Sequence, residues 1–576
     1  MKKITVSLLC VLLLCSVFFC PGAAAGRRAA AAQTETVMAA APSQFLLVME
    51  KCLRAFSLCF STFFSQLFSP ADWFSPAETQ IPKALVAARE LLLTDVPSDG
   101  GALTLGTLQG LLADRSETNL FFRAGAYAAF LPRTGAKLTQ TQPDGRPWDL
   151  TALLQKFAGF LDGYILCDDE SAAVAVSLSR QLNSVAVPEA VEAAALAAGL
   201  RRTFDARGKD DAWLRRSPYF CRLNRAVAFE QRADMAPRLV DYAVMCGAYF
   251  GFSASDNPWK HREKYAFLKN NALVFGWNQA LGEYETVAAF AKQNACLVPA
   301  DHAYNLSVLS GYDLAPFRQH TQAADDTDAA PAHTVCLLMS DGDNLQWLLN
   351  DYNNAAHFGS PVRGAFPFGW GVPAAAADLA APMLQTLYDA MSPRDEFVLS
   401  LSGVGYTFPS KWTNLTALRH MARTLPGKME AMDVSSLLVL DDGGFYSPAV
   451  DLLAKESGAN GILYIDYADY AGLRGAVRFA GDTPVVAARY RLWADAPGCS
   501  PEEIAAAINQ SALDPADPAS YSFVIVHAWS GLDGNGNLAE GGDTMAAVQA
   551  LVNALDENTR IVTPARFLDL IRRART

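Results

Sequence analysis

Residues 334–344 read TVCLLMSDGDN, an apolar run followed at once by a polar loop that contains two Asp residues. A short apolar run that ends at a Gly- and Asp-rich turn is typical of a strand buried in a parallel sheet. The same pattern recurs towards the C-terminus, where helical patterns alternate with it. The stretch therefore indicates an α/β fold and forms the first unit of a repeating series.

The region from His333 to Thr576 contains eight such runs, and most of them are followed by a helical pattern. Eight strand–helix units in about 240 residues predict a (β/α)8 barrel, the TIM-barrel architecture, for a C-terminal domain over residues 333–576. The fifth unit is the weakest, because residues 467–483 leave room for only a short helix. The predicted strands are 334–339, 364–368, 397–401, 436–440, 462–465, 484–488, 522–526 and 560–562.

The preceding region shows the same alternation with shorter units, which predicts small N-terminal α/β domains with mainly parallel sheets. We expect one domain over residues 81–175 and a second α/β region over residues 176–320, which would hold one or two small domains. The polar stretch Gln322 to Ala332 predicts a linker. No dinucleotide-binding or P-loop glycine motif follows a predicted strand, so we expect no nucleotide and no other cofactor.

The charge balance excludes one class of partner. Lys and Arg number 47 and Asp and Glu 59, which gives a net charge of −12. Binding to a phosphate backbone needs a basic patch, so we expect no nucleic-acid partner. The cysteines are scattered and form no C-x-x-C pair, which argues against a zinc site or a dense disulfide framework.

The first 25 residues have the organisation of a secretory signal peptide. Lys2 and Lys3 precede an apolar run, and Ala23 to Ala25 provide a small-residue cleavage site. We therefore expect a secreted or extracytoplasmic protein. Residues 26–80 form an Ala-rich tether and an amphipathic segment, whose part 45–68 either packs on the body or contacts a membrane surface. The sequence does not define the oligomeric state.

The C-terminal ends of barrel strands build the active site in this architecture, whereas the opposite face serves stability. Carboxylates, aromatic rings, an Arg pair and a His all follow predicted strands there, a combination that suits a sugar-processing site. The catalytic candidates are Asp341, Asp343, Asp441 and Asp466. The residues expected to bind substrate are Asn344, Trp347, Trp370, Tyr406, Trp412, Arg489, His527 and Trp529, and no metal ligands are predicted.

Each of these residues also has a purely structural interpretation. Asp-Gly sequences after a strand often form turns in which the Asp side chain bonds the backbone. A single His such as His527 at a strand end is often a hydrogen-bonded structural residue, and Trp370 and Tyr406 suit ordinary packing. The shared position of all these residues at strand ends is what favours a site.

The stretch 403–409 reads GVGYTFP and closely resembles the signature of the GxGYxYP family, with Phe408 where the signature has its second Tyr. The resemblance extends to MSDGDNLQW at 339–347 and YIDY at 464–467, and it reaches back to about residue 80 through the N-terminal stretches 107–111, 275–277 and 305–308. It implies a multi-part α/β region followed by a barrel-like domain. It also implies glycoside hydrolase activity, and hence a carbohydrate substrate.

Glycoside hydrolysis needs two carboxyl groups, one protonated to aid the leaving group and one ionised as nucleophile or base. Asp341 and Asp343 would repel each other when both are ionised, which raises one pKa and favours a proton donor. We expect one of them to be the acid, with Asp441 or Asp466 opposite. Aromatic side chains would stack on sugar faces, while Asn344 and Arg489 would bind hydroxyls or a uronic or acylated group.

Two other functions stay open at this point. A metal-dependent carbohydrate deacetylase would use Asp341, Asp343 and His527 in similar places, but the H-x-x-x-H pair of such enzymes is missing from the seven His. A non-catalytic glycan-binding protein would use the same aromatic and carboxylate residues without turnover. Glu283, Asp301 and His302 would complete the site only if the N-terminal domains pack over the barrel mouth.

Overall fold

The computed structural model describes residues 81–253, 257–321, 331–494 and 496–575. The predicted signal peptide, the tether and the segment 45–68 lie outside the described residues, as does most of the predicted linker. The described residues belong to one compact unit. Within them, no helix combines the length and the apolar character that a membrane span needs.

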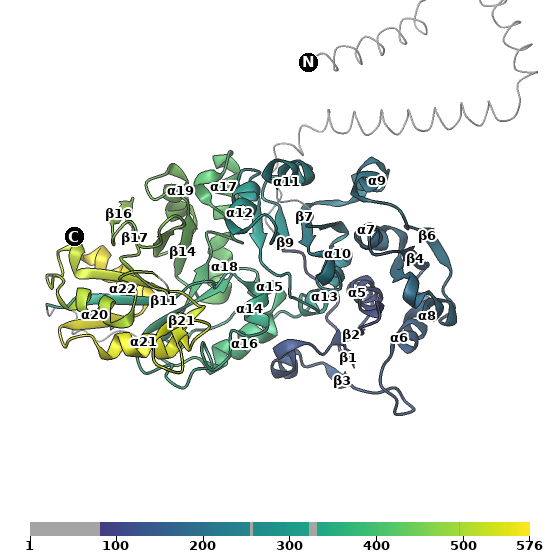
Figure 1. The fold of residues 1–576 in the computed structure, drawn as a ribbon, viewed down its shortest axis with the longest axis horizontal. Helices are drawn as coiled ribbons and strands as arrows, with labels where there is room; N and C mark the ends of the chain where they lie inside the picture. The colour runs from purple at the N-terminus through teal and green to yellow at the C-terminus, as the bar shows by residue number, and fades with distance from the viewer. Residues whose placement is uncertain (1–80, 254–256, 322–330, 495, 576) are drawn as a thin grey trace, which may run out of the picture. The chain divides into compact units, whose positions relative to one another are not determined.

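The N-terminal region contains three small parallel sheets (Figure 1). The first has the order β2-β1-β3 and consists of β1 (Glu90–Thr94), β2 (Thr118–Phe122) and β3 (Lys137–Thr139). The second has the order β5-β4-β6 and consists of β4 (Gly163–Cys167), β5 (Ser184–Pro188) and β6 (Arg202–Asp205). The third has the order β10-β9-β7-β8 and consists of β7 (Asn224–Gln231), β8 (Ala248–Phe252), β9 (Leu273–Gly276) and β10 (Cys296–Val298). The sequence correctly predicted parallel sheets here, whereas the division at residue 175 stays a prediction.

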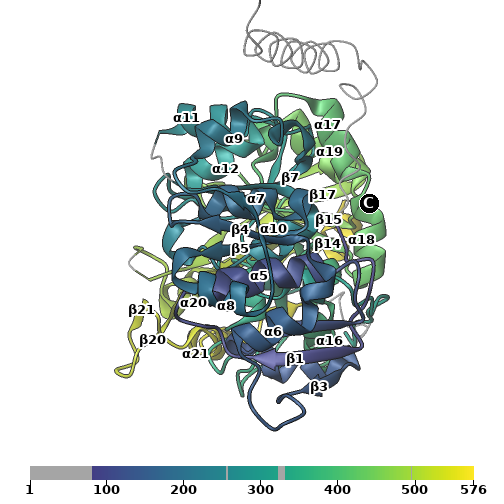
Figure 2. The same ribbon diagram turned by 90° about the vertical axis from the view of Figure 1, so that its right-hand side faces the viewer.

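Helices connect and cover these sheets, and α5 is the most central of them because all of its residues are buried. It packs on α10 and on β5 (Figure 2). Gly110 allows the close approach, since a Cβ there would lie 2.1 Å from the carbonyl oxygen of Asp241. The helices are α5 (Gly101–Leu112), α6 (Leu150–Phe157), α7 (Ala172–Leu182), α8 (Glu192–Ala197), α9 (Asp211–Arg216), α10 (Val240–Cys246), α11 (Pro258–Tyr265), α12 (Glu283–Ala291) and α13 (Leu306–Leu309).

The C-terminal region is built on one ten-stranded sheet with the order β16-β17-β15-β14-β13-β12-β11-β19-β18, to which β22 adds by pairing with β11. All neighbours pair in parallel except β16 and β17. The strands are β11 (His333–Met339), β12 (Phe368–Pro373), β13 (Asp395–Ser400), β14 (Ser436–Asp441), β15 (Gly461–Asp466), β16 (Val477–Ala480), β17 (Thr483–Ala487), β18 (Tyr490–Leu492), β19 (Tyr521–Val526) and β22 (Thr559–Val562).

The sheet curls as a half-barrel, and the predicted (β/α)8 barrel is not confirmed. Residues 483–492 pair first with β15, as β17, and then with β19, as β18, so that one stretch of chain serves as two strands. The β16–β17 hairpin takes the place of the fifth helix. The last strand, β22, pairs only with the first half of β11. The repeat therefore lacks the regularity that a closed eight-unit barrel requires.

Helices follow most strands of this region, and two of them, α15 and α16, lie between β12 and β13. They are α14 (Leu345–Leu349), α15 (Ala376–Leu379), α16 (Ala381–Ala390), α17 (Leu415–Ala422), α18 (Leu425–Met432), α19 (Pro448–Glu456), α20 (Pro501–Asn509), α21 (Thr544–Asn553) and α22 (Pro564–Ala574). A hairpin of β20 (Ser530–Leu532) and β21 (Leu538–Glu540) follows β19. The parallel strands bring their C-terminal ends, and the loops that follow them, to one edge of the curled sheet.

Candidate active site

The loop after β13 carries the stretch GVGYTFP, and it lies against strand β10 of the third N-terminal sheet. Backbone hydrogen bonds of 2.7 and 2.9 Å join Tyr406 to Leu297. A Cβ at Gly405 would lie 2.7 Å from the carbonyl oxygen of Leu297, and one at Gly403 would lie 2.6 Å from the sulfur of Met421. Gly405 therefore allows a close approach to the backbone of β10 that a larger residue would prevent, whereas the neighbour of Gly403 is a flexible side chain.

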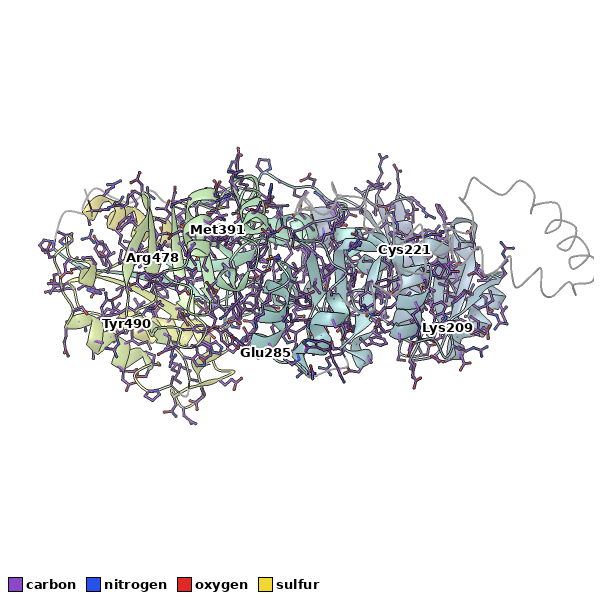
Figure 3. All side chains as sticks on the ribbon, turned by 90° about the horizontal axis from the view of Figure 1, so that it is seen from above. Lys209, Cys221, Glu285, Met391, Arg478 and Tyr490 are labelled. Atoms are coloured by element: carbon purple, nitrogen blue, oxygen red, sulfur yellow. The ribbon has the colours of Figure 1, made fainter. Side chains whose placement is uncertain are left out.

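This docking places the side chain of Tyr406 next to the first residue of α12. The Tyr406 hydroxyl donates a hydrogen bond of 2.7 Å to Oε1 of Glu283. Burial raises the pKa of Glu283, the hydrogen bond from Tyr406 lowers it, and the charge of Asp341 raises it. Figure 3 shows Glu285, two residues further along α12, where the N-terminal and C-terminal regions meet. Glu283, which sequence reasoning placed in the site only conditionally, thus contacts the C-terminal region.

Two more carboxyl groups follow β11. Asp341 has a positive φ of 59°, and its carboxylate accepts a hydrogen bond from the Ser340 hydroxyl. Asp343 is only 7% exposed. Burial raises the pKa of Asp343 well above its ordinary value, and the charges of Asp341 and Glu283 add to this effect. Glu283, Asp341 and Asp343 therefore form one interacting group, which we call the carboxylate trio.

Aromatic rings lie beside the trio. His527, which follows β19, stacks on Trp493 with 3.7 Å between ring centroids and an angle of 6°. Tyr470 meets Trp493 edge-on at 5.0 Å. The pKa of Tyr470 is raised well above its ordinary value by burial first, and then by the charges of the carboxylate trio among others. The half-buried rings of Tyr470, Trp493 and His527, which we call the aromatic wall, therefore lie within electrostatic reach of the trio.

His527 is half-buried, and it is hydrogen-bonded as well as stacked. Burial lowers its pKa, against the opposing charges of Asp341 and Glu540. Its Nδ1 lies 2.8 Å from the Ser530 hydroxyl. The structure is therefore consistent with both a structural role and a substrate-binding role for His527, because it is hydrogen-bonded and also lies at the site.

A second aromatic pair continues from the loop after β11. Trp347 and Trp529 lie 5.0 Å apart between ring centroids. Trp347 is buried while Trp529 is half-buried. The Nε1 of Trp347 and Oδ1 of Asn344 are buried without a hydrogen-bond partner among the described residues. Of the predicted substrate-binding residues, Asn344, Trp347, Tyr406, His527 and Trp529 therefore remain candidates.

The structure does not favour Asp441 and Asp466 as the opposing carboxylates. Asp441 is fully buried, and its carboxylate accepts hydrogen bonds from the Ser410 hydroxyl, the Ser410 N–H and the Asp442 N–H. Burial raises the pKa of Asp441 to about 6 even though these bonds lower it. Asp466 accepts the N–H groups of Gly443 and Ala468. Both residues order loops at the carboxyl edge, which is the turn chemistry that the sequence left open.

Three predicted substrate-binding residues lie elsewhere. Trp370 is fully buried because β12 begins at Phe368, four residues later than predicted, so that Trp370 lies inside the strand and donates to Asp395 at 3.0 Å. Trp412 is buried and donates to the Thr407 hydroxyl at 2.7 Å. Arg489 points to the opposite end of the sheet, where it donates to the carbonyl of Tyr521, the first residue of β19. The structure does not favour these three residues as substrate-binding residues, and that role stays an untested prediction.

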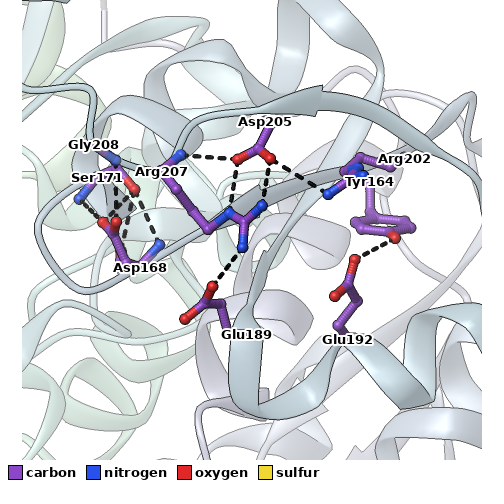
Figure 4. Close-up of polar contacts among 9 residues, drawn as sticks. All are labelled: Tyr164, Asp168, Ser171, Glu189, Glu192, Arg202, Asp205, Arg207 and Gly208. Carbon is purple, nitrogen blue, oxygen red and sulfur yellow. Dashed lines mark hydrogen bonds and ion pairs between the residues drawn. The ribbon is translucent and has the colours of Figure 1, made fainter.

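A cluster of charged residues at strand ends does not by itself make a site, as the second sheet shows (Figure 4). Arg207 pairs with Asp205 and with Glu189 at 2.6 and 2.7 Å, and Asp168 accepts the N–H groups of Ser171 and Gly208. These residues satisfy one another. The carboxylate trio differs, because no ion pair in the described part of the chain involves any of its members.

Sequence reasoning did not include Trp493 and Tyr470 among the site residues. The predicted strand 484–488 matches β17, but β18 at 490–492 was not predicted, and Trp493 directly follows it. The described residues contain no group of three or more His, Cys, Asp or Glu side chains arranged to hold a metal ion. The arrangement as a whole offers carboxyl groups with raised pKa values next to half-buried aromatic rings.

Two family models match this chain. The model described as "GxGYxYP putative glycoside hydrolase C-terminal domain" matches residues 332–572, and the model described as "GxGYxYP third domain" matches residues 225–311. The chain belongs to the GxGYxYP family. Glu283 lies in the third domain, and Tyr406 lies in the C-terminal domain. The hydrogen bond from Tyr406, the first Tyr of the GxGYxYP signature, therefore joins the two matched domains. Phe408, which departs from the GxGYxYP signature, is fully buried and packs on Tyr406.

A solved structure with a similar fold comes from Bacteroides thetaiotaomicron and is described as a putative hydrolase. The two chains are 22% identical with a TM-score of 0.76, and the match covers 88% of this GxGYxYP chain and 99% of the other. At this identity the likeness shows the fold alone. None of the curated proteins matches this chain in sequence.

Proposed function

We propose that this protein is an exported glycoside hydrolase whose reacting groups belong to the carboxylate trio. The observation that carries the proposal is the hydrogen bond from Tyr406 to Glu283, which holds one carboxyl group of the third domain near Asp341 and Asp343. The family description and the description of the structural neighbour support hydrolysis. Export rests on the sequence of residues 1–25 alone.

The trio can supply the two roles that glycoside hydrolysis needs. Burial raises the pKa values of Glu283 and Asp343, which favours the protonated form that a general acid requires. Glu283 is the more accessible of these two residues, so we assign it the role of acid. Asp341, which is also half-buried, then acts as nucleophile or base, and the buried Asp343 lies within electrostatic reach of both.

The aromatic wall and Trp529 suit the binding of sugar rings. Aromatic side chains bury large apolar faces and keep a polar edge available for hydrogen bonds. Stacking of Trp493 on His527 leaves the two rings parallel, and Tyr470 braces Trp493 from its edge. Because three rings hold one another in place, little side-chain entropy is lost when a sugar binds against them.

The charges at the site favour a neutral glycan. The charges that act on Glu283 and Asp343 come from carboxylates of the trio. Arg489, which the sequence offered as a partner for a uronic acid, lies at the other end of the sheet. An anionic sugar would therefore meet like charge from the trio, which raises the free energy of binding.

The experiment is hydrolysis of a panel of neutral oligosaccharides, with xylan-, mannan-, cellulose- and starch-derived members, by the full chain and by the Asp341→Asn and Asp343→Asn variants. We expect product from at least one neutral member, reduced by about 10²-fold or more in both variants. Polygalacturonate, as the anionic member, should not be cleaved. Undiminished hydrolysis in both variants would show that the trio is not the reacting group, and binding without any product would favour a non-catalytic glycan-binding protein.

A further inference from the structure

Two surface segments of the N-terminal region pack together and carry an excess of positive charge. Residues 211–225 comprise α9 and the turn that leads to β7, and residues 257–269 comprise α11 and the turn after it. Arg215 joins the segments, since its guanidinium donates to the carbonyl of Lys264 and lies over the ring of Phe267. Figures 1 and 2 show α9 and α11 at the same edge of this region. We call the exposed surface of the two segments the basic face.

The basic face is positive although the chain as a whole is acidic. Its two segments contain eight Lys and Arg against two Asp and Glu, a net charge of +6, whereas the whole chain carries −12. Five of the eight, of which four are exposed and Lys269 is half-buried, make no ion pair and no side-chain hydrogen bond among the described residues: Arg216, Arg222, Lys260, Arg262 and Lys269. The fold thus gathers unpaired cations from two separate stretches, which is why the sequence shows no run of positive charge.

An exposed indole accompanies these cations. Trp259, the second residue of α11, is 68% exposed. Arg262 follows it by three residues, so the two side chains are neighbours on the surface of the helix. Trp is enriched at the headgroup level of membranes, and clusters of Lys and Arg bind anionic lipid headgroups. Free cations beside an exposed Trp therefore fit an anionic lipid surface.

The negative charge of the rest of the chain does not prevent such a contact. At physiological ionic strength the Debye length is about 8 Å, so exposed charges that lie further away are largely screened. Cations close to an anionic surface are attracted to it within the same distance. A local group of free cations therefore binds an anionic surface even when the net charge of the protein is −12.

We propose that the basic face docks the exported protein on an anionic phospholipid surface, with Trp259 at the headgroup level. Residues 1–25 predict export, which takes the chain to the outer side of a membrane and away from nucleic acids. If the predicted amphipathic segment 45–68 contacts the membrane, the basic face supplies the second attachment that stable anchoring generally needs. The basic face shares no residue with the carboxylate trio or the aromatic wall, so its role does not depend on hydrolysis.

The test is sedimentation of the full chain with vesicles of phosphatidylcholine alone and with vesicles of phosphatidylglycerol and phosphatidylcholine in equal parts. We expect tighter binding to the anionic vesicles. This binding should be lost when the salt rises from about 0.1 M to about 1 M, where the Debye length falls from about 10 Å to about 3 Å. Arg216→Glu combined with Arg222→Glu should weaken binding to the anionic vesicles at least about tenfold, and Trp259→Ala should also weaken it.

The matched control is Lys156→Glu combined with Lys455→Glu. It changes the net charge by the same amount, but at exposed residues of α6 and α19, outside the basic face. This control should bind the anionic vesicles as the wild type does. All variants share the N-terminal segments, so their binding to the neutral vesicles should be alike. The changed side chains are exposed, so the variants are expected to fold.

Equal binding of the wild type and the Arg216→Glu, Arg222→Glu variant to the anionic vesicles would overturn the proposal, and so would the absence of any binding to them. An equal loss in the lysine control would assign the effect to net charge and would also overturn it. Binding of the wild type to polygalacturonate but not to the anionic vesicles would assign the basic face to an anionic polysaccharide instead. No glycan is cleaved in the vesicle assay, so a failure of the hydrolase leaves its outcome unchanged.

Discussion

Tyr406 of the signature loop donates a hydrogen bond of 2.7 Å to Glu283, a residue 123 positions earlier in the chain. The contact couples the third domain to the C-terminal domain at the point where three carboxyl groups interact. It also explains why a Tyr is needed there, because only its hydroxyl both reaches Glu283 and lowers the pKa of that group. Removal of the hydroxyl should change the pH dependence of the reaction and leave the fold intact.

Tyr406→Phe should lower kcat/KM by about tenfold to a hundredfold, the range expected for a hydrogen bond to an ionisable group. The hydrogen bond lowers the pKa of Glu283, so its loss raises that pKa further. If Glu283 is the acid, activity falls as the pH rises through this pKa, and the alkaline limb of the pH profile should move to higher pH. Tyr242→Phe, which removes a buried hydroxyl that bonds Pro82, is the control. An unchanged alkaline limb would show that Tyr406 does not affect the pKa of the catalytic acid.

Trp493→Ala should raise KM about tenfold with a smaller change in kcat, because a stacking ring stabilises the bound sugar before and during the reaction. The loss should also free the ring of His527, which stacks on Trp493. Trp213→Ala removes an indole that packs on Phe204 and serves as the control. Steady-state kinetics on the neutral glycan found in the panel measure both constants. A KM equal to that of the wild type would remove Trp493 from the substrate site.

The sequence predicted the units of the fold better than their closure. Runs such as 334–339 and 522–526 match β11 and β19 within one residue, because a buried parallel strand is nearly continuous in apolar residues. The curl of the sheet depends on residues 483–492, which pair with β15 and then with β19. No local pattern in residues 483–492 shows that this stretch forms two strands with different partners. The sequence therefore predicted a regular eight-unit barrel that the structure does not confirm.

The site was predicted in part, for a similar reason. Asp341 and Asp343 follow the strand with the clearest apolar pattern, so their place at the carboxyl edge was correct. Trp370 was misplaced because the predicted strand began four residues before β12, which moved a buried residue to a strand end. Glu283 begins a helix in another domain, and only the tertiary contact with Tyr406 brings it to the site. A contact of this kind leaves no signal in the spacing of residues.

Trp370→Phe should lower the free energy of unfolding by about 2 kcal/mol, because it opens space in the core and removes the hydrogen bond to Asp395. Asp395 would still pair with Arg363 at 2.6 Å, which limits the loss. Chemical denaturation measures the change. KM for the glycan should stay at the wild-type value, since Trp370 has no exposed surface. A large rise in KM without a loss of stability would return Trp370 to the substrate site.

Glu396 on β13 makes stability depend on pH. Burial raises its pKa from 4.5 to about 7, against hydrogen bonds from Thr563 and from the N–H of Ala565 at the start of α22. Between these two values the folded chain keeps a proton that the unfolded chain releases, so stability falls as the pH rises through this window.

The corresponding variant isolates this group. The wild type should lose about 3 kcal/mol of its free energy of unfolding between pH 4.5 and pH 7, as the pKa shift and about 1.4 kcal/mol per pKa unit imply. Glu396→Gln should not show this loss. Denaturation at several pH values compares the two chains. Parallel stability curves for the wild type and the variant would show that Glu396 titrates alike in the folded and unfolded states.

The proposed role of Glu283 in catalysis on the glycan is tested by the change of one side-chain atom. Glu283→Gln keeps the shape of the side chain and removes the transferable proton, so kcat should fall by about 10²–10⁴-fold. Glu285→Gln, two residues later on α12, is the matched control and should keep wild-type kcat. The measurement is kcat for both variants on the same neutral oligosaccharide. A wild-type kcat for Glu283→Gln would contradict the account, whereas loss in that variant alone is the result it predicts.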